Sequence, residues 1–374
     1  MRAAALSTRS FRNLADARID LGAGLTVVHG TNGAGKTNLL ESLFFALTGR
    51  SCRTRREREM VTFGSELARA EVELEPEPGE SLEPVTMLAS ISGKDGRRRR
   101  IDGREVTPED DRRRPALSVF MPDRLALVKG PPGPRRAHLD RLAAALWPAR
   151  GAARADYARA LAQRNALLAR VRRGTAGPAA LEAWDAELAA RAVPLTEVRA
   201  AAAAELEEPF TRAGERLGLP AAGTLSYRPQ AGERGVEELT AELSERREGD
   251  IARGFTVWGP HRDDVELRLG DRSLRRYGSQ GQQRIGLLAL LFAEREALRR
   301  ARQALPLMLL DDVMSELDPE RRARLVDLLD DGGQSVITAT ESQHVPDGSS
   351  HRRLVVEAGS VTAPGGPLEG AGGG

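Results

Sequence analysis

The chain has 374 residues, of which 40% are hydrophobic and 29% are charged, and its mean hydropathy is −0.39. This balance is typical of a globular protein and excludes disorder throughout, while the length predicts two domains or one large domain with an insertion. The longest apolar run, residues 287–293, is too short for a bilayer crossing, which needs about 20 residues. The first residues also lack the apolar stretch of a signal peptide. We therefore expect a cytoplasmic protein without a membrane partner.

Charge and cysteine content narrow the function classes further. Lys and Arg together number 56 against 54 for Asp and Glu, a net charge of +2, so global charge argues only weakly for nucleic acid. A single cysteine, Cys52, excludes an internal disulfide and a cysteine zinc cluster. Arginine greatly outnumbers lysine, which indicates compositional bias, so a lysine inside a motif is more informative than any arginine. Lys36 is such a lysine.

The first part of the chain predicts strands around a glycine-rich turn. Residues 1–29 alternate apolar and polar side chains and end in an apolar run at 25–28, which predicts strands. Apolar residues at helical spacing then predict a helix over 36–47. Further strands are predicted at 67–74, 85–92 and 117–120, and the pair Asp102-Gly103 predicts a tight hairpin. The N-terminal part therefore reads as strand, glycine loop and helix, followed by an antiparallel sheet.

The middle of the chain favours long helices. From about 135 to 217 the composition shifts to Ala, Arg, Leu and Glu, with short breaks expected at Trp147-Pro148, at 174–178 and at Pro194. Two helices packed antiparallel across 174–178 would form an arm. Strand-like signals resume near 255–257 and at 265–269, followed by a helix over 283–301 and apolar strands at 307–310 and 335–339.

Composition then suggests the domain boundaries. We expect an N-terminal part of the main domain at 1–134, a helical arm at 135–250, a C-terminal part of the main domain at 251–361, and a disordered Gly- and Pro-rich tail at 362–374.

The sharpest motif is the glycine turn. Residues 30–37 match G-x-x-x-x-G-K-[ST] and lie between a predicted strand and a predicted helix, the context that this motif needs. In such a loop Lys36 reaches phosphate oxygens and the Thr37 hydroxyl binds Mg²⁺, whereas a chance glycine turn is a rare alternative. The predicted nucleotide-binding residues are Gly30, Thr31, Asn32, Gly33, Ala34, Gly35, Lys36, Thr37 and Asn38. The motif predicts ATP and Mg²⁺ as ligands.

A pair of carboxylates follows the apolar strand at 307–310. Asp311 is expected to bind Mg²⁺ together with Thr37, because a P-loop site needs such an acid on a neighbouring strand. Asp312 is expected to position or deprotonate the attacking water, which makes Asp312 and Lys36 the predicted catalytic residues. Without the P-loop, the same two residues would indicate only a solvated acidic turn.

A second helix start also carries polar residues. Ser279, Gln280, Gly281 and Gln282 precede the amphipathic helix predicted at 283–301. A helix N-terminus with a serine hydroxyl and a glycine binds phosphate. An ordinary serine or glutamine cap explains the same residues equally well.

These motifs occur in the order P-loop, S-x-G-Q, acidic strand and then 315–318. That order resembles the ABC ATPase head of the SMC and Rad50 class, and the chain is most similar to the RecF family of bacterial recombination proteins. The resemblance runs from residue 1 to about 360. It rests on Phe11–Asn13, Gly30–Asn38, Gly130-Pro131, Arg135-Arg136, Leu139-Asp140, Arg164-Asn165, Gly259–Asp264, Tyr277–Arg284 and Leu309–Asp318. It implies an α/β fold, namely an ABC-type ATPase head with an inserted short helical arm. The head combines a P-loop sheet with an antiparallel β subdomain, and the arm forms the second lobe of proteins in this family.

The resemblance also implies how such a protein works. Two heads form an ATP-dependent homodimer, in which each nucleotide lies between Lys36, Thr37 and Asp311 of one subunit and Ser279 and Gly281 of the other. Asp318 would cross the interface, and slow, DNA-dependent ATP hydrolysis would release the dimer. The implied partners are double-stranded DNA, gapped DNA, RecR and RecO. With them the protein would help to load a recombinase in DNA replication, repair and the SOS response.

One departure from the wider ABC pattern concerns γ-phosphate sensing. No glutamine occurs between Thr37 and Gln163, so the glutamine that senses the γ-phosphate in ABC proteins is missing. The loop around Pro122-Asp123 is the expected replacement.

Two questions stay open from the sequence: which residues contact DNA, and which other functions fit the same motifs. Arg53, Arg55 and Arg56 follow the P-loop helix and either neutralise DNA phosphates or are solvated arginines. Aromatic residues make up only 4% of the chain and none interleaves with this cluster, which favours backbone contact with a duplex over stacking on single strands. The rivals are another ABC-type ATPase subunit, for which the arm is unexpectedly large, and a P-loop phosphotransferase, which leaves 279–282 unexplained.

Overall fold

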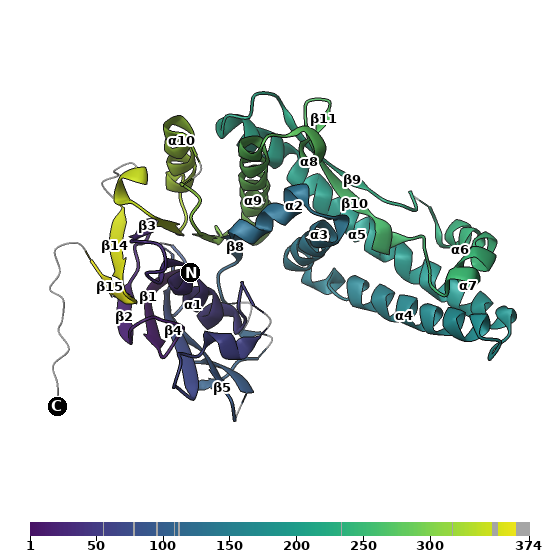
Figure 1. Ribbon diagram of the computed structural model, residues 1–374, viewed down its shortest axis with the longest axis horizontal. Coiled ribbons are helices and arrows are strands. Elements are labelled where there is room, and N and C mark those ends of the chain that lie inside the picture. Colours follow the sequence, from purple (N-terminus) through teal and green to yellow (C-terminus); the bar gives the residue numbers. More distant parts are fainter. Residues whose placement is uncertain are drawn as a thin grey trace. The chain divides into compact units, whose positions relative to one another are not determined.

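A computed structural model describes the chain except for residues 55, 78, 95, 108, 111–112, 233, 316, 346–350 and 364–374, and it is shown in Figure 1. The chain divides into two compact units, each of which is described by itself. The first comprises residues 1–122 together with the chain from Arg302 onward, and the second comprises residues 123–301. The first unit is thus built from two separate stretches of sequence, as expected for a domain with an insertion.

The compact division differs from the boundaries expected after residues 134 and 250. Residues 251–301 fall in the same unit as the arm helices. Ion pairs explain this association, since Arg135 pairs with Asp264 at 2.7 Å and Arg199 pairs with Asp263 at 3.1 Å. In both pairs a buried arginine joins segments that are far apart in the sequence.

The first unit contains a mostly parallel sheet of six strands. Its order is β15-β14-β3-β13-β12-β8, in which only β15 runs antiparallel to its neighbour. The strands are β3 (Leu25–His29), β8 (Leu117–Phe120), β12 (Leu307–Leu310), β13 (Ser335–Ala339), β14 (Arg352–Glu357) and β15 (Ser360–Thr362). Every residue of β12 and β13 is buried, as expected for parallel strands covered on both faces. The helices α1 (Lys36–Thr48) and α10 (Pro319–Asp330) belong to the same unit.

A second sheet in this unit is antiparallel, with the order β2-β1-β4-β5-β6-β7. Its strands are β1 (Arg2–Arg9), β2 (Ala17–Asp20), β4 (Leu67–Glu75), β5 (Val85–Ser92), β6 (Gly96–Ile101) and β7 (Arg104–Glu105), and the short 3-10 turn η1 (Glu57–Met60) precedes β4. Burial alternates along β5, so one face lies on the core. The predicted hairpin is confirmed, because Asp102 and Gly103 have φ angles of 48° and 81° between β6 and β7. One hydrophobic core joins this sheet, α1 and the parallel sheet.

The second unit combines long helices with a small antiparallel sheet of order β11-β10-β9. Its helices are α2 (Ala126–Lys129), α3 (Pro132–Leu146), α4 (Ala153–Arg172), α5 (Leu181–Arg216), α6 (Val236–Glu245), α7 (Arg247–Arg253), α8 (Leu274–Tyr277) and α9 (Gln280–Arg302). Its strands are β9 (Gly223–Arg228), β10 (Asp264–Leu269) and β11 (Arg272–Ser273). The predicted packing of two helices across 174–178 is confirmed, because Leu168 and Val171 of α4 share a buried cluster with Leu181 of α5.

Two local predictions are wrong. The break expected at Pro194 does not occur, since α5 continues through both Pro194 and Pro209. A proline inside a helix costs about 3 kcal/mol, which is offset here by burial of Leu188, Leu195 and much of the rest of this long helix. The segment 255–257 is not a strand; instead Thr256 donates its backbone N–H to Asn165 Oδ1 at 2.8 Å.

Across the part of the chain that the structure describes, none of the helices combines the length and apolar character that a bilayer crossing requires.

Candidate nucleotide site

The glycine loop lies between β3 and α1 in an unusual backbone conformation. Gly30, Gly33 and Gly35 have φ angles of 156°, 81° and 124°, which L side chains rarely adopt. Gly30 is also sterically confined, because a Cβ there would lie 2.2 Å from the carbonyl oxygen of Val356 on β14. The loop therefore needs glycine for its shape, and at Gly30 it packs directly against the backbone of β14.

The loop leads into the positive end of α1. The first turn of this helix contains no acidic residue and no side-chain cap, so its N–H groups are available for an anion. The Lys36 ammonium donates to the carbonyl oxygens of Gly30 at 2.7 Å and Thr31 at 2.9 Å. Burial lowers the pKa of Lys36, and the charges of Asp312 and Asp311 act in the opposite direction. The arrangement fits a bound phosphate group.

Thr37 and Asp311, the two predicted Mg²⁺ ligands, lie side by side. The Thr37 hydroxyl is 2.8 Å and 2.9 Å from the two carboxylate oxygens of Asp311. The carboxyl ends of β3 and β12 meet at the same edge of the parallel sheet, with β13 between them. From β13, Thr338 donates to Asp311 Oδ1 at 2.8 Å. Burial raises the pKa of Asp311, and the neighbouring charge of Asp312 adds to the shift. A desolvated carboxylate beside a hydroxyl suits a divalent cation.

Asp312 occupies a strained position at the same edge. Its φ angle is 48°, which is uncommon outside glycine. Its backbone N–H donates to Thr338 Oγ1 at 2.8 Å, and Ser315 Oγ donates to its Oδ2 at 3.1 Å. Its Oδ1 is buried and finds no hydrogen-bond partner among the described residues. An unpaired buried acceptor is costly, and it suits a group that holds a water.

The S-x-G-Q residues form a helix cap in the second unit. Ser279 Oγ accepts the N–H of Gln282 at 3.2 Å, and Gln282 Oε1 accepts the N–H of Ser279 at 2.9 Å, a reciprocal arrangement typical of N-caps. Ser279 and Gln280 are exposed, and Gly281 is partly exposed. The geometry therefore matches the ordinary cap and presents the same residues on the surface. The P-loop lies in the other unit.

Asp318, expected at a dimer interface, also caps a helix. Its Oδ1 accepts the N–H of Arg321 at 2.9 Å at the start of α10. The neighbouring Glu316 and the side chains of Pro122 and Asp123 lie outside the described residues.

The three predicted DNA-binding arginines differ in their surroundings. Arg53 Nη1 donates to Asn38 Oδ1 at 2.8 Å and lies 3.4 Å from Glu41 Oε2, so Arg53 contacts the residue that follows Thr37. Arg56 has a side chain that is 87% exposed and lies 4.0 Å from Glu59. Arg55 lies outside the described residues.

Two residues beside the loop were not predicted as site residues. Glu41 is a fully buried carboxylate on α1 that accepts two hydrogen bonds from Arg12, at 2.9 Å and 3.0 Å. The sequence offers one indication that Glu41 is unusual: it is a charged residue on the apolar face of a predicted helix. Asn13 donates to the Gly33 carbonyl at 3.2 Å and accepts from Asn38 at 2.7 Å. No local pattern predicts these contacts, because Asn13 and its partners are distant in the sequence.

Known proteins are similar to this chain over nearly its whole length. The family model described as the RecF/RecN/SMC N terminal domain matches residues 4–362. A protein of Myxococcus xanthus named DNA replication and repair protein RecF is 40% identical and covers 92% of each chain. A protein of the same name from Heliobacterium modesticaldum is 37% identical over 92% of this chain and 93% of its own.

Solved structures show the same fold. A structure described as the recombination mediator protein RecF-ATP in the RecFOR pathway matches with a TM-score of 0.83 and 25% identity, over 96% of this chain and 97% of that one. An SMC head bound to the C-terminal winged-helix domain of ScpA matches with a TM-score of 0.60 at 14% identity, over 99% of this chain and 98% of that one, which shows a shared fold only.

Proposed function

Because this chain belongs to the RecF family of SMC-like ABC ATPases, we propose that it is an ATP-dependent DNA-binding protein of recombinational repair and replication. Its relatives carry the name DNA replication and repair protein, and one similar structure is described as a RecF-ATP complex. The observation that carries the proposal is the contact between Thr37 and Asp311 at 2.8 Å, with Lys36 beside it.

ATP and Mg²⁺ fit the residues at this edge of the sheet. The N–H groups of residues 30–38 would bind the phosphates at the positive end of α1, and Lys36 would move from the loop carbonyls to phosphate oxygens. Thr37 and Asp311 would hold Mg²⁺, which neutralises phosphate charge when bound. Asp312, through its unpaired Oδ1, would orient the attacking water. We expect turnover to be slow, because the site is completed only by assembly.

The exposed cap at Ser279 supports a composite site. In the proposed homodimer, Ser279, Gln280, Gly281 and Gln282 of one subunit bind the nucleotide of the other, at the N-terminus of α9. Asp318 lies at the same interface. A nucleotide that binds the dimer better than the monomer favours assembly by that difference in affinity, so ATP controls the dimer and its hydrolysis releases it.

Double-stranded DNA near a single-strand gap is the proposed nucleic-acid partner. Arg53, Arg55 and Arg56 are candidates for phosphate contacts, and Arg53 would connect DNA to the nucleotide loop through Asn38. Together with RecO and RecR, the protein would help to load a recombinase during the SOS response.

Sedimentation of the purified protein with ATP and Mg²⁺, with and without gapped duplex DNA, tests the proposal. We expect nucleotide-dependent dimers that bind DNA, and Lys36→Ala should abolish both nucleotide binding and dimerisation. Ser279→Arg should block dimerisation and leave nucleotide binding by the monomer intact. A normal dimer from Ser279→Arg would contradict the composite site. A monomer that binds ATP and ignores DNA would instead favour a phosphotransferase.

A further inference from the structure

A fully buried threonine lies beside the two aspartates of the proposed nucleotide site. Thr338 belongs to β13, which runs between β3 and β12, the strands that lead into the glycine loop and into the aspartates. Thr338 pairs in register with Val28 of β3, and Ile337 pairs with Leu310 of β12. Thr338 therefore stands next to Asp311, the residue that follows Leu310, and it is 0% exposed. A buried polar side chain needs hydrogen-bond partners, and those of Thr338 belong to the site.

The hydroxyl of Thr338 contacts both aspartates at once. It donates to Asp311 Oδ1 at 2.8 Å and accepts the backbone N–H of Asp312 at 2.8 Å. A hydroxyl has a single proton to donate, and here that proton goes to the carboxylate expected to bind Mg²⁺. Hydrogen bonds to an ionised acceptor are stronger than those between neutral groups. One side chain thus ties the orientation of the first acid to the backbone of the second.

The contact with Asp311 sets the plane of its carboxylate. Oδ1 accepts from Thr338, while Oδ2 lies 2.9 Å from the Thr37 hydroxyl. The two oxygens together have about four acceptor positions, so the two threonines leave room for a cation or for a water bound to it. Partners that orient a metal ligand in this way raise metal affinity.

The contact with Asp312 holds a strained backbone. The φ angle of Asp312 is 48°, an uncommon conformation for a residue other than glycine. Thr338 binds the N–H of this residue, and Ser315 Oγ donates to its Oδ2 at 3.1 Å. Its Oδ1 is buried and has no hydrogen-bond partner in the described part of the chain. The backbone and one carboxylate oxygen are therefore fixed, and the other oxygen can accept from a water.

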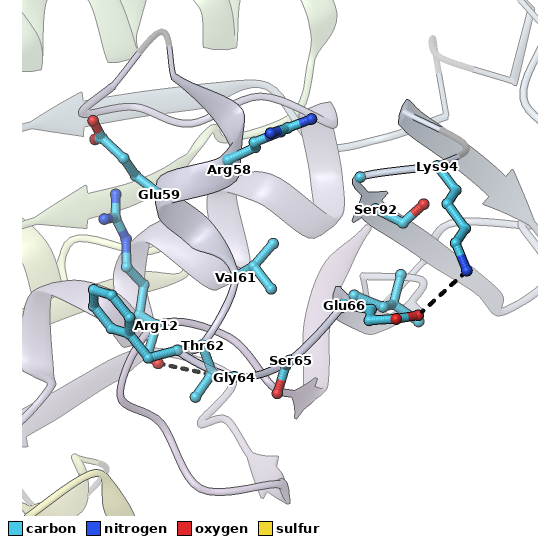
Figure 2. A pocket seen from close by; sticks show the side chains of 13 residues that line it. Arg12, Arg58, Glu59, Val61, Thr62, Gly64, Ser65, Glu66, Ser92 and Lys94 are labelled. Carbon is cyan, nitrogen blue, oxygen red and sulfur yellow. Dashed lines mark hydrogen bonds and ion pairs between the residues drawn. The ribbon is translucent and has the colours of Figure 1, made fainter.

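Arg12 shows what a threonine hydroxyl does for a left-handed residue elsewhere in the same unit. Its φ angle is 55°, and the Thr62 hydroxyl donates to its carbonyl oxygen at 2.7 Å. Figure 2 draws this bond as a dashed line at the wall of a pocket that both residues line. Thr338 holds Asp312 in a similar way, but it also donates to a carboxylate. Holding the backbone does not require this second contact, which indicates a role in the chemistry of Asp311.

We propose that Thr338 is a positioning residue for ATP hydrolysis. Its hydroxyl holds Asp311 in the orientation that binds Mg²⁺ and Asp312 in the conformation that directs the attacking water. The inference rests on the proposed function and deepens it, because it names the residue through which the two acids act together. Thr338 acts through the aspartates and not on the nucleotide. Binding of ATP by the glycine loop should therefore not depend on it, whereas use of Mg²⁺ and turnover should.

The test compares variants of the full chain. Thr338→Val keeps nearly the shape of threonine and removes the hydroxyl, and Thr338→Ser restores the hydroxyl. Thr26→Val is the matched control, because Thr26 is also 0% exposed, lies on the neighbouring β3 and accepts the Gly22 N–H at 2.9 Å. Thermal unfolding without nucleotide shows which variants are folded. Thr338→Ala, which removes the hydroxyl without placing a methyl group beside the acids, takes the place of Thr338→Val if the latter is unfolded.

The first measurement is binding of a fluorescent N-methylanthraniloyl-ATP, without turnover as the readout. In EDTA, Thr338→Val should bind this nucleotide as wild type does. The Mg²⁺ concentration at which the metal increases nucleotide affinity should rise about tenfold. Thr338→Ser and Thr26→Val should match wild type in both conditions. Weaker binding in EDTA, or an unchanged Mg²⁺ requirement, would overturn the role assigned to the contact with Asp311.

The second measurement is ATP turnover at saturating Mg²⁺, where the effect on Asp312 is isolated. Thr338→Val should lower kcat about tenfold and leave KM for ATP nearly unchanged, and Thr338→Ser should retain most of the wild-type kcat. In an Asp312→Asn background, Thr338→Val should cause no further loss, because residues that act through one another are not additive. Equal losses in the two backgrounds would show that Thr338 does not act through Asp312.

The results separate this inference from the proposed function. If Thr338→Val hydrolyses ATP as wild type does while Lys36→Ala is inactive, the inference is wrong and the proposed function stands. If wild type neither binds nor hydrolyses ATP, both are overturned. If Thr26→Val loses as much turnover as Thr338→Val, the loss reflects packing of the sheet and the inference is wrong.

Discussion

Asp311 is a residue whose charge costs stability and whose proposed role, binding Mg²⁺, requires that charge. Burial raises its pKa, so its contribution favours the folded state at low pH and is lost as pH rises through the folded pKa. Ionising this carboxyl in its buried position therefore costs stability. Functional sites commonly keep a group that lowers stability when activity depends on that group.

Asp311→Asn should therefore unfold at a higher temperature than wild type at neutral pH in the absence of nucleotide. It should also lose the stabilisation by ATP and Mg²⁺, which for wild type is about 2.7 kcal/mol at a ligand concentration of 100 times Kd. Thermal unfolding of both proteins with and without nucleotide measures both effects. A variant that is less stable without nucleotide, or equally stabilised by it, would contradict the role assigned to this carboxylate.

Asp312 is expected to act on water and not on nucleotide binding. Asp312→Asn should slow ATP turnover by at least tenfold, because an amide cannot accept a proton, and should preserve an ATP-bound dimer in sedimentation. Steady-state phosphate release measures the first effect. Unchanged turnover would show that another group positions the water.

For single residues, the sequence predicts which side chains of the nucleotide site lie together better than it predicts how exposed a side chain is. The P-loop spacing and the end of an apolar strand predict that Thr37 and Asp311 lie together, and the hydroxyl and the carboxylate are 2.8 Å apart. The exposure of Phe63, whose side chain is 105% exposed, could not be predicted, because large apolar side chains are more often buried.

Among the elements, the helices of the second unit are joined by a buried arginine. Arg164 on α4 is fully buried and donates at 2.7 Å to Asp185 of α5 and at 2.7 Å to Asp250 of α7. Arg247 also donates to Asp185, at 2.7 Å. Within the described part of the chain, Asp250 forms no ion pair with a second arginine, so it depends on Arg164 for its countercharge.

Arg164→Met should lower the free energy of unfolding of this unit by about 3–5 kcal/mol, because it leaves the buried carboxylate of Asp250 without its countercharge. Arg191→Met is the matched control: it breaks an exposed pair with Glu187, in which the side chains are 48% and 43% exposed, and should cost no more than about 0.5 kcal/mol. Urea unfolding followed by tryptophan fluorescence reports this unit, since Trp147, Trp184 and Trp258 all lie in it. Equal effects of the two substitutions would contradict the role of the network.

Element boundaries show where sequence patterns succeed and fail. The strands at 85–92, 117–120, 307–310 and 335–339 have the predicted bounds, because alternation and short apolar runs are local signals. The continuation of α5 through Pro194 was missed, since it depends on packing along the whole helix. The compact division after residue 301 also rests on long-range pairs such as Arg199 with Asp263, which no local window contains.

For the molecule as a whole, buried histidines make stability depend on pH. Burial lowers the pKa of His138 to about 3 and that of His261 to about 4, whereas both titrate near 6.5 in the unfolded chain. His138 lies 3.9 Å from Glu294, whose pKa is raised by burial, so this carboxyl favours the folded state as pH falls. The two histidines act in the opposite direction. Their contribution to stability is complete above pH 6.5 and is lost as pH falls towards the folded pKa values.

Lowering the pH from 7.5 to 5.5 should therefore destabilise the wild-type unit by about 1 kcal/mol more than a variant that lacks one of these histidines. Urea unfolding at the two pH values, followed by tryptophan fluorescence, measures the change. His138→Gln should remove its share of the pH dependence. The same pH dependence in wild type and His138→Gln would be incompatible with a neutral, buried imidazole.

The position of β3 in its sheet has a consequence for biosynthesis. β3, which leads into the P-loop, pairs with β13 on one side and β14 on the other, and both of these strands come from residues 335–357. During synthesis, both edges of β3 therefore stay without their partner strands until more than 300 further residues have been added. The second unit is synthesised completely within that interval and can fold first. A nascent or truncated chain that ends before residue 335 cannot assemble the nucleotide loop on its sheet, so only chains translated past that point are able to enter an ATP-dependent cycle.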